Sequence, residues 1–317
     1  MKKYLIALSL FILLTTSFAT LIYLQSTRSN DIESPLPEFL SQKENPEVSS
    51  LDFWLPTVLG FFTGTGDEPQ LSAKSVLVYD LKNNKPVFEK NPKERLPMAS
   101  LTKLMTAIIA IDHKRADGRY VVLPEALVGE NTIGLSEGEV MSLEELLYGV
   151  FMYSANDAAE TLAINTLGRA EFIKAMNDKA KALGLTDTNF TNPTGLEGDG
   201  NQYSTATDLL VISKYAIENY PEIRKAASTA EYYLPATSDH YEYYLYSQLN
   251  LLTTYPGVKG LKDGYTPEAG WCLITYIEYG DQKIIGIILG SENRRDEMRS
   301  LLDYSLIKLG VNPPPRI

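Results

Sequence analysis

The first candidate for chemistry is a serine followed three residues later by a lysine, in Ser100-Leu101-Thr102-Lys103. On a helix this spacing places both side chains one turn apart on the same face. A serine hydroxyl is a weak nucleophile until a base takes its proton, and a lysine whose charged form is disfavoured by burial can be that base. Leu104 and Met105 predict such burial. The start of the helix would also favour a developing oxyanion at Ser100.

Few other side chains could replace this lysine as a base or hold a metal. The chain has two histidines, His113 and His240, and one cysteine, Cys272. Neither histidine lies in a motif with metal-ligand spacing, and a single cysteine excludes an internal disulfide and every multi-cysteine metal site. Cys272 lies in an apolar run, which predicts a buried and inert thiol. We therefore expect neither a metal nor a cofactor.

Two further motifs follow the serine–lysine pair. Ser154-Ala155-Asn156 lies between an apolar helical pattern and helix-forming residues, where a turn can present a hydroxyl and an amide together. Lys262-Asp263-Gly264 lies before a predicted pair of strands. Its lysine could hold an anionic substrate terminus, and its glycine would let a substrate backbone approach closely.

Each motif by itself is a weak signal. All three patterns recur once near the C-terminus, at residues 305–308, 291–293 and 308–310, where ordinary helix and turn roles are the simpler interpretation. The order of the three motifs is more restrictive, with 54 residues from Ser100 to Ser154 and 108 from Ser154 to Lys262.

In this order the motifs resemble those of the D-alanyl-D-alanine carboxypeptidases, the low-molecular-mass penicillin-binding proteins, which carry SxxK, an SxN-type triplet and KTG. The resemblance covers roughly residues 71–309. Five segments carry it: MASLTKLMTA (98–107), YSANDAA (153–159), NPTGL (192–196), YSTATDL (203–209) and GYTPEAG (264–270). Many relatives also have a C-terminal β-rich domain with an anchoring helix, whereas this sequence ends at Ile317.

The resemblance implies a mechanism and a set of partners. Ser100 would attack the penultimate D-alanine of a peptidoglycan stem peptide, with Lys103 as the base, and water would hydrolyse the acyl-enzyme. β-Lactams would acylate the same serine. The resemblance further implies that Ser154 relays a proton and that Asn156 binds the substrate amide. The N–H groups of Ser100 and of Tyr265, which follows Gly264, would form the oxyanion hole. Lys262, with Arg294 or Arg295, would bind the substrate carboxylate.

Asp263 is the clearest departure from the family pattern, because it stands where relatives usually have threonine. It removes a hydroxyl donor and adds a negative charge near the expected site of a substrate carboxylate. We expect it to repel that carboxylate unless it is paired with Lys262 or an arginine, or points away from the site.

Three alternatives share some or all of these motifs. A β-lactamase would need an additional glutamate-activated water, and the nearest candidates, Glu197 and Asp199, lie in a glycine-rich turn. A peptidoglycan endopeptidase shares every motif with a carboxypeptidase. A catalytically weak scaffold that binds peptidoglycan is the non-enzyme alternative, and Asp263 motivates it.

The elements that must position these residues alternate between strands and helices. We expect a hairpin of strands at 76–81 and 86–90, and then four helices. These lie at 101–111, after the capping box that begins at Ser142, at 171–183, and at 205–218 with Ser204 as N-cap. Strands at 271–279 and 283–289 and a last helix at 293–309 follow. Strands at both ends predict one mixed sheet with a helical insert. The resemblance implies an α/β (α+β) fold of the β-lactamase and transpeptidase type, in which helices flank an antiparallel sheet of about five strands and a largely helical subdomain carries Ser100, Lys103, Ser154 and Asn156.

The N-terminus and the charge balance indicate where the protein works. Residues 4–24 form an uncharged run of 21 residues after Lys2 and Lys3, and a helix of that length spans roughly 31 Å, close to a bilayer core. We expect residues 1–24 to be a membrane anchor, or a signal sequence cleaved after Ala19, with the rest exported and released if cleavage occurs. Residues 25–70 indicate a linker, and its apolar part at 51–62 would pack on the folded domain or lie at the membrane surface. Residues 71–317 would form the peptidase domain. With Lys+Arg 29, Asp+Glu 40 and net charge −11, nucleic acid is not an expected partner.

Overall fold

A five-stranded sheet is the frame of the folded region. The computed structural model describes residues 68–315. The sheet has the order β2-β1-β9-β8-β7, and its strands are β1 (Ser75–Asp80), β2 (Lys85–Lys90), β7 (Val258–Thr266), β8 (Gly270–Tyr279) and β9 (Gln282–Ser291). All four pairings are antiparallel. The five antiparallel strands implied by the resemblance are therefore confirmed, and the mixed sheet is wrong because β9 returns beside β1 in the opposite direction.

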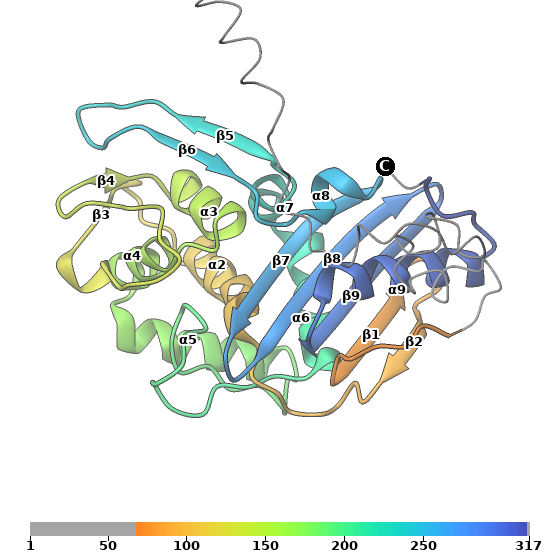
Figure 1. The fold of residues 1–317 in the computed structure, drawn as a ribbon. Coiled ribbons are helices and arrows are strands. Elements are labelled where there is room, and N and C mark those ends of the chain that lie inside the picture. Colours follow the sequence, from red (N-terminus) through yellow and green to blue (C-terminus); the bar gives the residue numbers. More distant parts are fainter. Residues whose placement is uncertain (1–67, 316–317) are drawn as a thin grey trace, which may run out of the picture. The chain divides into compact units, whose positions relative to one another are not determined.

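Helices cover both faces of this sheet (Figure 1). Helix α9 (Arg294–Lys308) packs on one face, and α6 (Ala206–Asn219) packs on the other. Alternation along β1 supplies both interfaces, since Val76 and Val78 join the core under α9 while Leu77 joins the core on the helical side. Burying each such side chain stabilises the fold by about 1.5–3 kcal/mol.

The helical subdomain beside β7 is built around α2, which is buried along most of its length. Its elements are α2 (Lys103–Asp112), α3 (Leu143–Met152), α4 (Asn156–Thr166), α5 (Arg169–Ala182) and α7 (Pro221–Ala227), with the two-stranded sheets β3 (Tyr120–Val121)–β4 (Val140–Met141) and β5 (Glu231–Leu234)–β6 (Tyr243–Tyr246), and with α8 (Leu251–Thr254) after β6. The predicted capping box is confirmed at α3, where the Glu145 N–H donates to Ser142 Oγ and the Ser142 N–H donates to Glu145 Oε2.

Three details of the predicted elements are corrected. A 3-10 turn at Ala99–Thr102 precedes α2, which begins at Lys103 and not at Leu101. Thr205, not Ser204, caps α6, because the backbone of Ser204 is already paired with Leu96. The Lys262 motif does not precede the strands but lies inside β7, a strand that the sequence did not predict.

The N-terminal predictions lie outside the described residues. This applies to the anchor or signal at 1–24, to the linker up to residue 67 and to the apolar segment at 51–62. Within residues 68–315, no helix is both long and apolar enough to cross a bilayer.

Candidate active site

Ser100 and Lys103 meet at the junction of the helical subdomain and the sheet. Lys103 Nζ lies 2.9 Å from Ser100 Oγ, so the predicted pair is formed. The same nitrogen donates to Asn156 Oδ1 at 2.7 Å and to the carbonyl oxygen of Thr194 at 2.7 Å. Lys103 is fully buried, and Ser100 is nearly so.

Close backbone contacts fix the position of Ser100. Ala99, directly before Ser100, has φ +49°, a left-handed conformation that is uncommon for a residue with a side chain. Gly195 lies against it, and a Cβ at position 195 would stand 2.0 Å from the Ala99 carbonyl oxygen. On the other side, a Cβ at Gly264 would stand 2.8 Å from the Ser100 nitrogen. Both glycines therefore let other backbone segments of the protein approach the serine, while the predicted approach of a substrate backbone at Gly264 stays a prediction.

Burial changes the proton affinity of Lys103. Desolvation, and secondarily the charge of Lys262, lowers the pKa of Lys103 well below its ordinary value, although Asp263 and other carboxylates oppose this shift. A neutral amine has two N–H groups and one lone pair. The carbonyl oxygens of Asn156 and Thr194 can take the two N–H groups, which leaves the lone pair for the Ser100 hydroxyl.

Thr194 is a site residue whose role the sequence reasoning missed. Its segment is held by Asn192, whose Oδ1 accepts the N–H groups of Thr194 at 3.1 Å and Gly195 at 2.7 Å. Thr106 Oγ1, from α2, donates to the Pro193 carbonyl at 2.6 Å. The only signal was membership of the NPTGL segment, because a backbone carbonyl has no signature in the sequence.

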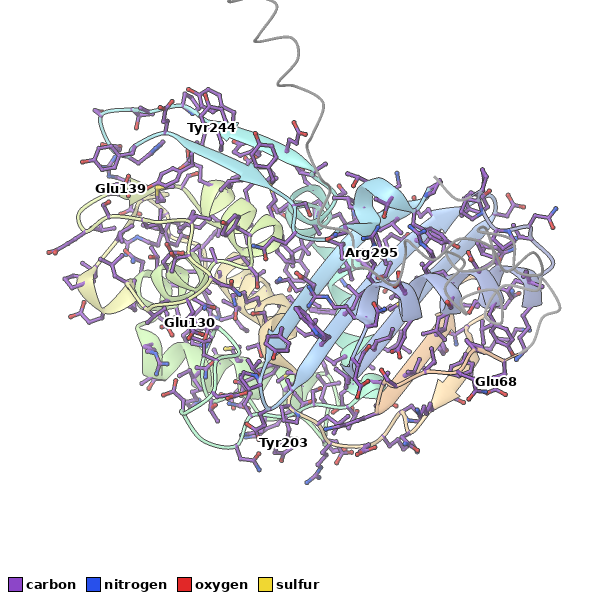
Figure 2. All side chains as sticks on the ribbon, in the orientation of Figure 1. Glu68, Glu130, Glu139, Tyr203, Tyr244 and Arg295 are labelled. Carbon is purple, nitrogen blue, oxygen red and sulfur yellow. The ribbon has the colours of Figure 1, made fainter. Side chains whose placement is uncertain are left out.

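Ser154 presents a buried hydroxyl with no hydrogen-bond partner among the described residues. Its φ is +57°, and such strain in a non-glycine residue is typical of functional sites. Asn156 has a partner at each end of its amide, because its Nδ2 donates to the Glu130 carbonyl at 2.8 Å while its Oδ1 accepts from Lys103. Figure 2 labels Glu130 in the loop beside α4. Asn156 thus orients Lys103 in this structure, and substrate binding by its amide stays a prediction.

Lys262, Asp263 and Arg294 form one charge cluster, in which Lys262 and Asp263 are buried and Arg294 is partly buried. Lys262 Nζ lies 3.1 Å from Asp263 Oδ1, and Arg294 Nη2 lies 2.6 Å from Asp263 Oδ2. Lys262 also donates to the Asp263 carbonyl at 2.8 Å, and Arg294 to the Gly264 carbonyl at 2.7 Å. Burial would raise the pKa of Asp263, but the two cations outweigh it and hold that pKa below its usual range. Of the two alternatives for Asp263, pairing with the cations is therefore the one observed.

Arg294 is the arginine of this cluster. Its guanidinium carbon lies 4.4 Å from the ring centre of Trp271, and the Trp271 and Tyr265 rings are 4.3 Å apart. Tyr265 is half-exposed at the outer edge of β7. Arg295 follows Arg294 and is exposed (Figure 2), and both arginines line a small pocket together with Asp263. An open strand edge of this kind can accept an extended peptide.

The three patterns that recur near the C-terminus, at residues 305–308, 291–293 and 308–310, do not form a serine–lysine site. Ser305 is buried without a hydrogen-bond partner, while Lys308 donates to the Val87 carbonyl and to Tyr304. Asn293 caps α9, and its neighbour Ser291 donates to Glu297. Cys272 is buried, and burial raises its pKa to about 11, as expected for an inert thiol.

Comparison with known proteins gives one consistent result. The sequence matches a family described as D-alanyl-D-alanine carboxypeptidase over residues 63–293. It is 36% identical to D-alanyl-D-alanine carboxypeptidase DacF of Bacillus subtilis over 76% of this chain and 64% of that protein, so it spans less than two thirds of that relative. It is 33% identical to a D-alanyl-D-alanine endopeptidase of Pseudomonas aeruginosa over 65% of this chain and 67% of that protein. The fold is similar to cefotaxime-bound penicillin-binding protein D2 of Listeria monocytogenes, with TM-score 0.66, 32% identity and coverage of 76% of this chain and 99% of that one.

Proposed function

The chain belongs to the D-alanyl-D-alanine carboxypeptidase family, and we propose that it removes the terminal D-alanine from peptidoglycan stem peptides through an acyl-enzyme on Ser100. The observation that carries this proposal is the buried Lys103 Nζ at 2.9 Å from Ser100 Oγ. A serine nucleophile with a desolvated amine beside it can attack a carbonyl without a histidine.

Acylation begins when neutral Lys103 takes the Ser100 proton. Ser100 Oγ bonds to the carbonyl carbon of the penultimate D-alanine, and the carbonyl oxygen becomes an oxyanion. The N–H groups of Ser100 and Tyr265 would stabilise that charge. The nearness of Gly264 to the Ser100 nitrogen supports this arrangement, because it brings β7 against the nucleophile.

The tetrahedral intermediate collapses when the C–N bond breaks and the leaving D-alanine nitrogen receives a proton. The buried, unpartnered hydroxyl of Ser154 supports its proposed role as the relay between Lys103 and that nitrogen. Water then adds to the ester carbonyl, with Lys103 again as the base, and Ser100 is released with its proton restored.

The charge cluster would receive the substrate carboxylate. If both cations and Asp263 are charged, the cluster carries one net positive charge, because one carboxylate is shared between Lys262 and Arg294. A substrate carboxylate must therefore compete with Asp263 for the same donors. This sharing favours a second candidate function, endopeptidase cleavage, because the residue beyond the scissile bond of a cross-link need not present a free carboxylate there.

Product analysis tests these functions directly. Full-length protein in detergent would be incubated with monomeric pentapeptide muropeptides and, separately, with cross-linked dimers. Free D-alanine from the monomers is the expected result. Conversion of dimers to monomers without D-alanine release would instead identify an endopeptidase, and penicillin binding without either product would identify a scaffold.

Replacing Asp263 by threonine should strengthen binding of substrates with a free terminal carboxylate. Buried Lys262 and partly buried Arg294 would lose their shared partner, so a substrate carboxylate could pair with both. We expect the KM for a peptide ending in D-Ala-D-Ala to fall about tenfold, equivalent to roughly 1.4 kcal/mol. The KM for the same peptide with an amidated terminus should change little.

Two controls accompany this measurement. Asp281→Thr removes an exposed carboxylate in the β8–β9 turn and should leave both constants unchanged. Thermal unfolding reports whether Asp263→Thr is folded. A higher KM for the free acid in a folded variant would show that Asp263 orients its cations and does not compete with the substrate.

We also propose that residues 4–24 hold the exported chain at the cell membrane. The support is the length and position of this uncharged run after Lys2 and Lys3. Full-length protein should remain in the membrane fraction and be digested by protease added outside the cytoplasm. An N-terminal sequence beginning at Thr20 would show cleavage after Ala19 instead.

A further inference from the structure

The β5–β6 ribbon exposes an unusual row of aromatic side chains. Tyr233, Tyr244 and Tyr246 are 48%, 60% and 58% exposed. They lie on one face, because Tyr233 is paired with Tyr244 across the ribbon and Glu231 with Tyr246. The opposite face is buried against α3, where Tyr232 stacks on Tyr148. We call the outward side the tyrosine face, and define it as Glu231, Tyr233, Glu242, Tyr244 and Tyr246.

Side chains of the tyrosine face contact one another. The Tyr233 and Tyr244 rings stack with centres 4.4 Å apart, and the Tyr233 hydroxyl donates to Glu242 Oε2 at 3.1 Å. On the buried side, the Tyr243 hydroxyl donates to Glu139 Oε2 at 2.6 Å. Tyr244 and Glu139 are labelled at this end of the molecule in Figure 2. Single exposed hydrophobic residues are normal, but a rigid group of aromatic rings is typical of an interaction surface.

The charges of the ribbon restrict its partner. No lysine or arginine stands between Lys225 and Lys259, whereas Glu231 and Glu242 lie on the tyrosine face itself. A nucleic acid or an anionic lipid surface would need cations at this place. A second copy of the same face would bring like carboxylates together. A neutral polyhydroxylated chain fits better, because its C–H faces can stack on the rings while its hydroxyls donate to the carboxylates.

The ribbon leads directly to the active site. After β6, the Gln248 N–H donates to the Met152 carbonyl at 2.8 Å, two residues before Ser154. Gln248 also lines the pocket that contains Asp263 and Arg294. Figure 1 shows the ribbon beside α3, at the same end of the molecule as α8 and the start of β7. A polymer on the tyrosine face would therefore run close to the pocket that contains Asp263 and Arg294.

We propose that the tyrosine face binds the glycan strand of peptidoglycan and so positions the attached stem peptides near Ser100. The identity of the polymer rests on the proposed function, but the binding surface does not include any catalytic residue. Aromatic rings supply stacking area at low entropic cost, and Glu231 and Glu242 supply acceptors for sugar hydroxyls.

Binding to a neutral polymer of β-1,4-linked N-acetylglucosamine tests the proposal, because this polymer has the sugar rings and hydroxyls of a glycan strand but no stem peptide for Ser100 to cleave. The full-length protein in detergent should bind this polymer when it is immobilised. Tyr244→Ala with Tyr246→Ala should weaken binding at least tenfold, whereas Tyr244→Phe with Tyr246→Phe should retain most of it because the rings remain. Val211→Ala, which trims an exposed apolar side chain on α6, is the matched control and should have no effect.

Penicillin acylation separates this proposal from the catalytic one. The rate should be the same in the alanine variants and the unaltered chain, which also shows that the variants fold. Unchanged glycan binding in the alanine pair would overturn the proposal. It would also be overturned if the tyrosines were needed for binding to phosphatidylglycerol vesicles, or for self-association in sedimentation, but not for glycan binding. If glycan binding needs the tyrosines but no D-alanine is released, the surface stands and the carboxypeptidase assignment fails.

Discussion

Ser100→Ala will abolish covalent labelling of the chain by a fluorescent penicillin. A β-lactam offers a strained amide to the same nucleophile that would attack a D-alanine carbonyl, so the label reports the acyl-enzyme directly. Loss of the nucleophile should also reduce D-alanine release by on the order of 10⁶-fold, as it does when a serine protease loses its serine. Labelling is measured on denatured protein, where only a covalent adduct survives.

The chain contains its own control for this substitution. Ser305 has the same spacing to Lys308 as Ser100 has to Lys103, but Lys308 is bonded elsewhere. Ser305→Ala should therefore leave labelling intact. Label that persists in Ser100→Ala, or that is lost in a folded Ser305→Ala, would remove Ser100 from the nucleophilic role.

The spacing of residues predicted the centre of the site because a local rule was sufficient. Three positions along one turn bring Ser100 and Lys103 together even though Ser100 lies in a 3-10 turn ahead of α2. The apolar sequence after Lys103 likewise predicted its burial. The strands β1, β2, β8 and β9 were found for the same reason, since each has a clear apolar pattern between turn residues.

Other parts of the site depend on contacts between distant segments. No pattern indicates that the Thr194 carbonyl will meet Lys103, because every residue has a carbonyl. The sequence left open whether Asp263 pairs with the nearby cations or points away from the site. In the fold Asp263 pairs with a cation, because Arg294, the first residue of α9, lies beside β7.

Strand β7 was missed because its residues disfavour a strand. Lys262, Asp263 and Gly264 are polar or flexible, and such residues are depleted in sheets. They are tolerated because β7 is the edge strand and because Gly264 must admit the Ser100 backbone. The residues of β7 that depart from strand propensity are therefore those in the part of the sheet that faces Ser100.

Replacing Lys103 by alanine should lower the rate of penicillin acylation by about 10²–10⁴-fold, the usual contribution of a positioned general base. Ser100 would keep its proton, and no other described group takes the place of Lys103 beside its hydroxyl. Lys103→Arg is the informative companion, because it keeps a positive charge but has no neutral form at accessible pH. Both variants should show the slow acylation, and thermal unfolding shows whether each is folded.

The pH dependence of acylation gives an independent test of the same base. Only neutral Lys103 can accept the Ser100 proton, so the rate constant should rise with pH through the pKa of the folded lysine and then level off. Burial lowers that pKa well below the ordinary value for lysine of about 10.4. The rise should therefore be complete before that ordinary value is reached, and it should be absent from the residual reaction of Lys103→Ala. A rise centred near the ordinary lysine pKa, or one that persists unchanged in Lys103→Ala, would show that another group is the base.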